Sequence, residues 1–284
     1  MKGPQFLIYV NPILTSLKDM GGAGFTAEVI DKVIELLAIP DSEVEITIPS
    51  GQSRIRNRIQ WARLYLVKAG YIDGSTIGTW TLTEKGWSSQ LNDDQVFELY
   101  SSVHSTFMVK PSSTKKESAK EKQEEEDAVI AEENHSGDLL SILHSLSPTG
   151  FERICKRLLT ACGFQNVQVT GKVGDNGIDG IGLLEINYLV SFKVLFQCKR
   201  FKESVGAPMI RDFRGAMGGR ADKGIIITTG YFTKEAKTEA VRDGVPPIEL
   251  VDGEKLVNLF EKFNLGLKPK TVYDIDVSFF EEFK

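Results

Sequence analysis

Cysteine is scarce in this sequence of 284 residues, which contains only three, Cys155, Cys162 and Cys198. No two of them form a CxxC pair, so neither a disulfide framework nor a zinc site of that spacing is expected. If one helix carries Cys155 and Cys162, a rise of ~1.5 Å per residue separates them by roughly 10 Å, which is too far for a disulfide bond. We therefore predict three reduced thiols, mostly buried.

Long apolar runs are also lacking. The longest one, from Leu183 to Phe196, is interrupted by Glu185, Asn187 and Lys193 and cannot serve as a membrane span. The first ten residues contain one lysine, a short apolar run and no small-residue cleavage site, which is not typical of a signal peptide. We expect a cytoplasmic protein that does not associate with membranes.

There is no overall excess of positive charge, since the formal net charge is −5. Residues 1–109 carry a net charge of −3, residues 110–135 another −3, and residues 136–284 a net +1. A protein that coats nucleic acid through bulk electrostatics is therefore excluded, and any affinity for DNA must come from local basic patches.

The length and the ordinary globular composition indicate two cores. Between them, residues 110–135 are dense in Ser, Lys and Glu and cannot bury enough apolar surface to fold alone. The sequence predicts a first domain at 1–109, a charged linker at 110–135, a second domain at 136–270 and an acidic tail at 271–284. A flexible coil and a stiff helical spacer both remain open for the linker.

In the first domain, two segments have helical apolar spacing, Ala27 to Ala38 and Arg54 to Ala69. Two short strand-like segments follow, at residues 71–74 and 78–83, and they predict a β-hairpin. Helices followed by a two-stranded hairpin are typical of a winged helix, an α+β fold.

The second domain alternates helical and strand-like patterns, and this order predicts a mixed sheet with helices on both faces, an α/β fold. The predicted helices are 150–159, 207–217, 234–242 and 253–263, and the predicted strands are 167–170, 178–183, 194–201, 224–229 and 248–251.

Three polar residues of this domain have a spacing that could support phosphodiester hydrolysis. The two-residue period of a strand places Gln197 and Lys199 on one face, and Asp179 would face them if its strand pairs with theirs in a hairpin. A carboxylate and an amide oxygen can hold Mg²⁺, while an ammonium group orients the attacking water. Glu152, on the preceding helix, could add a second carboxylate. On spacing alone, three solvated polar side chains explain the pattern better than a metal site does.

Several further motifs occur in the order seen in one nuclease family. They are Gly150-Phe151-Glu152, Gly177-Ile178-Asp179-Gly180, Phe196-Gln197-Cys198-Lys199-Arg200, Ile210-Arg211-Asp212-Phe213, residues 224–232 and residues 248–253. Over about residues 138–265 the chain resembles the Mrr-type restriction nucleases of the PD-(D/E)xK superfamily. Residues 57–70 and 78–86 are similar to the N-terminal winged-helix domain of the same family.

The resemblance implies a role for each residue of the polar group. Asp179 corresponds to the principal metal ligand, Gln197 to the second ligand in place of the usual acid, Lys199 to the catalytic lysine and Glu152 to the supporting acid of the helix. The implied cofactor is Mg²⁺, with Mn²⁺ as the alternative. A neutral amide binds a cation less strongly than a carboxylate, so we expect modest metal affinity.

The helix at 54–69 is the candidate for DNA contact, since arginine reads guanine in a major groove or grips phosphate. The residues predicted to bind DNA are Gln52, Ser53, Arg54, Arg56, Asn57, Arg58 and Arg63. A solvated helix face is the other interpretation.

These observations predict a modification-dependent, type IV-like restriction nuclease that cuts double-stranded DNA, including methylated DNA. Cutting both strands requires two active centres, so we expect a homodimer or a larger homo-oligomer. Two alternatives stay open: a structure-selective nuclease of DNA repair or recombination, and a DNA-binding regulator without catalytic activity.

Overall fold

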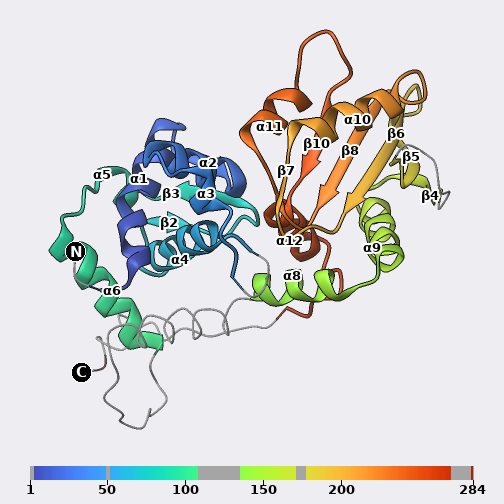
Figure 1. The fold of residues 1–284 in the computed structure, drawn as a ribbon. Helices are drawn as coiled ribbons and strands as arrows, with labels where there is room; N and C mark the ends of the chain where they lie inside the picture. Colours follow the sequence, from blue (N-terminus) through green and yellow to red (C-terminus); the bar gives the residue numbers. More distant parts are fainter. Residues whose placement is uncertain (1–2, 49–51, 108–134, 171–176, 270–282, 284) are drawn as a thin grey trace.

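The computed structural model describes residues 3–48, 52–107, 135–170, 177–269 and 283. Within these ranges the chain forms two bodies (Figure 1). The N-terminal body has one hydrophobic core cluster and the C-terminal body has two. The predicted linker lies, apart from His135, outside the described residues, and so does the predicted tail apart from Phe283. Within the described ranges, no helix is both long enough and apolar enough to cross a bilayer.

The N-terminal body is mainly helical and carries a small antiparallel sheet in the order β1-β3-β2. Its helices are η1 (Gln5–Tyr9), α1 (Val10–Asp19), α2 (Thr26–Leu36), α3 (Asp41–Val44), α4 (Arg54–Lys68), α5 (Glu84–Ser88) and α6 (Asp93–Phe107), and its strands are β1 (Ala23–Phe25), β2 (Ile72–Asp73) and β3 (Thr79–Leu82). The helix α4 is central, because its buried Ile59, Ala62 and Leu66 pack into the core formed with α1 and α2.

The C-terminal body is built on a five-stranded mixed sheet in the order β10-β8-β6-β5-β4 (Figure 1). The strands of this body are β4 (Gln165–Val169), β5 (Gly180–Asn187), β6 (Val190–Lys199), β7 (Ser204–Val205), β8 (Lys223–Thr228), β9 (Tyr231–Phe232) and β10 (Ile248–Val251). The helices of this body are α8 (His135–Ser145), α9 (Pro148–Ala161), α10 (Ala207–Met217), α11 (Lys234–Ala240) and α12 (Gly253–Lys262). The strands β6, β8 and β10 are parallel, whereas β4, β5 and β6 are antiparallel.

The strand β6 is buried on both faces of this sheet. Its Val194, Phe196 and Cys198 lie in a cluster with α8, α9 and α12, whereas Leu195 lies in a second cluster with α10 and α11. The pairing of Gly180 with Phe196 sets the register between β5 and β6, and Lys199 is paired with Thr228 of β8. This alternation agrees with the two faces predicted from the sequence.

The predicted helices and strands of both bodies are present, with differences of a few residues at their ends. The elements that were not predicted are the helices η1, α1, α3, α5, α6 and α8 and the short strands β1, β7 and β9. All three cysteines are free, as predicted.

Candidate active site

The β5–β6 hairpin brings Asp179 next to Gln197. Asp179 lies immediately before β5, and its backbone N–H donates to the carbonyl oxygen of Phe196 at 3.0 Å. Its carboxylate accepts a hydrogen bond of 2.6 Å from the backbone N–H of Cys198. Asp179 is therefore bonded to both chain neighbours of Gln197, and continuation of the Gly180–Phe196 register places it opposite Gln197.

Gln197 is buried, with 4% of its surface exposed. Its side-chain amide nitrogen donates a hydrogen bond to the carbonyl oxygen of Gly177. Its Oε1 atom is buried and has no hydrogen-bond partner within the described residues. An unsatisfied buried acceptor costs about 1–3 kcal/mol, so this oxygen is available to a partner from outside the described residues.

Glu152 and Lys199 complete the polar group. Glu152 lies in the first turn and a half of α9, a helix capped by the Ser147 hydroxyl, which accepts from the backbone N–H of Gly150 at 3.0 Å. Burial raises the pKa of Glu152, the nearby charge of Asp179 raises it further, and Lys199 opposes both effects. Burial also raises the pKa of Asp179, against the Cys198 hydrogen bond and the charge of Lys199. Glu152, Asp179 and Lys199 therefore lie within electrostatic range of one another, and Gln197 lies opposite Asp179 in the paired strands.

These side chains fit a hard divalent cation. Two carboxylates whose burial disfavours negative charge gain from a nearby cation, and the orphaned amide oxygen of Gln197 is a hard oxygen ligand. Among the described residues, no three Asp, Glu, His or Cys side chains converge on one point. A cation at this place would therefore depend on the amide oxygen in addition to carboxylates.

The residues predicted to contact DNA lie in and just before α4, and four of them are buried. Gln52, Ser53, Arg56 and Asn57 are each at most 6% exposed, whereas Arg54, Arg58 and Arg63 are partly exposed. Ser53 has a local structural role as the N-cap of α4, because its hydroxyl accepts from the Arg56 N–H and donates to the Val44 carbonyl oxygen at 2.6 Å.

Arg56 joins the two bodies. Its guanidinium pairs with Glu254 of α12 at 3.1 Å and with Asp31 of α2, and Asp31 also pairs with Lys237 of α11. We call Arg56, Asp31, Glu254 and Lys237 the docking cluster. The ring of Tyr231 lies under the guanidinium, 5.6 Å from centroid to carbon. In this arrangement the C-terminal body covers Arg56.

Burial dominates the electrostatics of the docking cluster. Burial alone would lower the pKa of Arg56, but Glu254 and then Asp31 outweigh it and raise that pKa, so the arginine stays charged. Burial raises the pKa of Glu254 to about 7, against the opposing charge of Arg56. Two charges removed from water stabilise a fold little unless they are fully paired.

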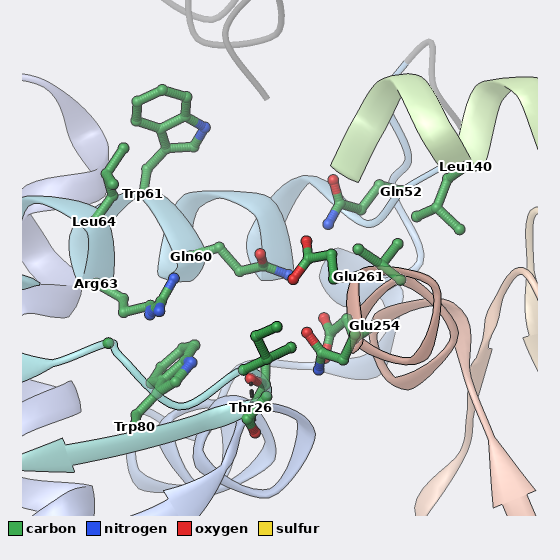
Figure 2. Close-up of a pocket in the computed structure, with 15 residues that line it drawn as sticks. Thr26, Gln52, Gln60, Trp61, Arg63, Leu64, Trp80, Leu140, Glu254 and Glu261 are labelled. Carbon is green, nitrogen blue, oxygen red and sulfur yellow. Dashed lines mark hydrogen bonds between the residues drawn. The ribbon is translucent and has the colours of Figure 1, made fainter. Parts of the chain in front are cut away.

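A cavity of about 240 Å³ lies beside the docking cluster, between α4 and α12. Figure 2 shows Gln60 and Arg63 of α4 on one side, Glu254 and Glu261 of α12 on the other, and Trp80 of β3 below Arg63. The guanidinium of Arg63 lies 5.4 Å from the Trp80 ring centroid. Desolvation lowers the pKa of Arg63, in opposition to Glu261. The interface between the two bodies is therefore polar and incompletely packed.

The sequence interpretation did not identify the docking cluster. Arg56 and Glu254 are 198 residues apart, and no local pattern connects them. It also assigned no role to Gly177, although a glycine two residues before Asp179 in a turn is a signal for an unusual backbone conformation. The structure gives Gly177 a φ of 84°.

Comparisons with known proteins agree with this architecture. Residues 143–260 match a family described as restriction endonuclease (Mrr_cat), and residues 6–90 match the Mrr N-terminal domain family. The type IV methyl-directed restriction enzyme EcoKMrr of Escherichia coli (strain K12) is 27% identical over 308 residues, covering 99% of this chain and 100% of that protein.

Two solved structures are more distantly similar. The DNA modification-dependent restriction endonuclease AspBHI is 17% identical with a TM-score of 0.40, and the match covers 67% of this chain and 53% of that one. The restriction endonuclease MspJI, solved with a 27-mer oligonucleotide, is 16% identical with a TM-score of 0.32, over 63% and 42% of the two chains. The two family matches and the full-length relative show that this chain belongs to the Mrr-type restriction endonucleases and is a nuclease.

Proposed function

We propose that this nuclease is a Mg²⁺-dependent, type IV-like restriction enzyme that cuts duplex DNA carrying modified bases, in defence against foreign DNA. The observation that carries the metal-dependent chemistry is the buried, orphaned Oε1 of Gln197 beside the Asp179 carboxylate. The E. coli relative, which aligns along the whole chain, is named as methyl-directed, and this supports dependence on modification.

In this proposal, Asp179 and Gln197 hold the cation, Glu152 assists, and Lys199 acts on the attacking water. A bound Mg²⁺ ion supplies Lewis acidity at the scissile phosphate. The carboxylate of Asp179 is fixed by the Cys198 N–H, so little reorganisation is required when the phosphate arrives. The ammonium of Lys199 orients the water and offsets the negative charge that develops on phosphate oxygens.

The N-terminal body would bind the duplex as a winged helix, with α4 as the recognition helix and β2–β3 as the wing. The partly exposed Arg54 and Arg58 are the accessible candidates for phosphate contact, whereas Arg63 lines the cavity between the two bodies. The buried Gln52, Arg56 and Asn57 could contact DNA only after the two bodies separate.

One centre of this kind cuts one strand at a time. We therefore propose that two or more copies of the chain act together on a duplex, since both backbones must be hydrolysed for a double-strand break. Mn²⁺ could replace Mg²⁺, because both ions accept octahedral oxygen ligands.

The proposal is tested with the full chain and matched plasmids that differ only in cytosine or adenine methylation. With Mg²⁺ we expect linear products from methylated plasmid, little cleavage of unmethylated plasmid, and none in EDTA. Ca²⁺ should support DNA binding without cleavage. Equal cleavage of both plasmids would reject dependence on methylation, preferential cleavage of branched DNA would favour the structure-selective alternative, and cleavage in EDTA would reject the metal-dependent chemistry.

A further inference from the structure

The backbone of Gly177 contacts the candidate metal ligand Gln197 directly. The carbonyl oxygen of Gly177 accepts the Gln197 Nε2 hydrogen bond. A primary amide has one donor end and one acceptor end, so fixing the nitrogen on Gly177 also fixes the direction of Oε1. The oxygen is left buried and without a partner in the described part of the chain.

From this contact we infer that Gly177 is a positioning residue, which orients the amide of Gln197 so that its oxygen faces the cation. The inference rests on the proposed role of Gln197 as a ligand. Such outer contacts hold ligands in place in metal sites generally, and their loss weakens metal binding.

Glycine is strongly favoured at this position. Its φ of 84° lies in the left-handed region, and a Cβ built there would collide with Gln197 Nε2. Alanine at position 177 would therefore push the amide away from its hydrogen bond. Gly163 provides a matched control, because its φ is 93° and a Cβ there would meet nothing within 4 Å.

Mn²⁺ binding to the full chain, measured by electron paramagnetic resonance without DNA, tests the inference. We expect Gly177→Ala to weaken Mn²⁺ binding by about tenfold or more, while Gly163→Ala binds as the parent does. Because Gly177 acts through Gln197, the double variant Gly177→Ala/Gln197→Ala should bind no more weakly than Gln197→Ala alone. Thermal melting of all four variants shows that each is folded.

The outcomes separate this inference from the proposed function. Parent-like Mn²⁺ binding by Gly177→Ala, or a further loss in the Gln197→Ala background, would overturn the positioning role. Parent-like binding by Gln197→Ala would instead reject Gln197 as a ligand and with it the basis of the inference.

The docking cluster carries a second inference independently. Arg56 lies at the N-terminal end of α4, where a recognition helix meets DNA, yet it is 4% exposed and held by two carboxylates. Carboxylate and phosphate oxygens bind a guanidinium in the same way. We propose that Glu254, which comes from the other body, occupies the place of a DNA phosphate on Arg56, so that docking of the two bodies and full DNA contact exclude each other.

The interface has the properties of one that can open. Ion pairs cross it, including Lys234 to Glu35 at 3.7 Å, and it borders the 240 Å³ cavity. Glu254 Oε1 and Gln52 Oε1 are buried there without hydrogen-bond partners in the described ranges. Polar interfaces of this kind between domains permit relative motion.

Glu254→Gln tests this proposal because it removes one carboxylate with little change in side-chain volume. We expect a larger radius of gyration by small-angle X-ray scattering and about five- to tenfold tighter binding of duplex DNA by fluorescence anisotropy. Lys237→Gln, at a half-exposed position, should shift both measurements in the same direction. Glu249→Gln, which removes an exposed ion pair with Lys255 outside the interface, is the control and should change neither.

Arg56→Ala distinguishes competition between docking and DNA binding from a purely structural role of Arg56. This variant should also have a larger radius of gyration. It should not bind DNA more tightly, because the arginine that undocking would release for phosphate contact is absent. Expansion of the Glu254→Gln variant with unchanged or weaker DNA binding would overturn the proposal, as would a Glu254→Gln variant that keeps the parent's dimensions and affinity.

Discussion

Replacement of Asp179 by asparagine is expected to lower the rate of DNA cleavage by roughly 10³-fold or more, since a carboxylate that holds a catalytic cation contributes several kcal/mol. Asparagine has nearly the same shape and keeps an oxygen that can accept the Cys198 N–H. The fold and the affinity for DNA should therefore persist. Cleavage is measured under single-turnover conditions, and DNA binding by anisotropy in Ca²⁺.

Asp222→Asn is a matched control for this variant. The carboxylate of Asp222 also accepts a backbone N–H, that of Lys193 at 2.8 Å, in the same domain but at an exposed position. It should cleave as the parent does. If Asp179→Asn cleaves at the parental rate, the site assignment is wrong, whatever the behaviour of the control.

Replacement of Lys199 by methionine is the second change with a large expected effect. Methionine retains much of the apolar stem but removes the ammonium group that would orient water and stabilise the transition state. Removal of a side chain with such a role lowers the cleavage rate by about 10²- to 10⁴-fold. DNA binding and Mn²⁺ binding should change little, so the loss should appear in the chemical step.

Lys193→Met is the control, because Lys193 lies on the same strand with the same alternation but at an exposed position, six residues before Lys199. A rate for Lys199→Met within twofold of the Lys193→Met rate would exclude a catalytic role for Lys199.

Much of the nuclease domain could be predicted from local sequence patterns. The strand β6 alternates between two apolar clusters, and the helices α9, α10 and α12 carry apolar residues at helical spacing. Side chains alternate between the two faces of a strand, so the prediction of β6 also predicted that Gln197 and Lys199 share one face. The placement of Asp179 opposite this face depended on antiparallel pairing of its strand with β6, and the structure has this pairing.

Other features depend on contacts between residues distant in sequence. The burial of Arg56 results from Glu254, and nothing near position 56 distinguishes a docked arginine from one exposed on a helix. The helix α1 has its buried Ile13, Leu14 and Leu17 at helical spacing, so its pattern was readable although it was not predicted. The orientation of the Gln197 amide requires the three-dimensional position of the Gly177 carbonyl.

The four positions Gly177, Asp179, Gln197 and Lys199 all belong to one hairpin and the turn that precedes it. A slip of the strand pairing by one residue would turn both polar side chains of β6 toward the apolar cluster that contains α8, α9 and α12, and it would carry Asp179 past its partner. Six consecutive pairs with β8, from Val194–Lys223 to Lys199–Thr228, oppose such a slip from the other side. The strand pairing thus aligns the candidate catalytic groups. The surface loops elsewhere in the domain can vary in length without disturbing this alignment.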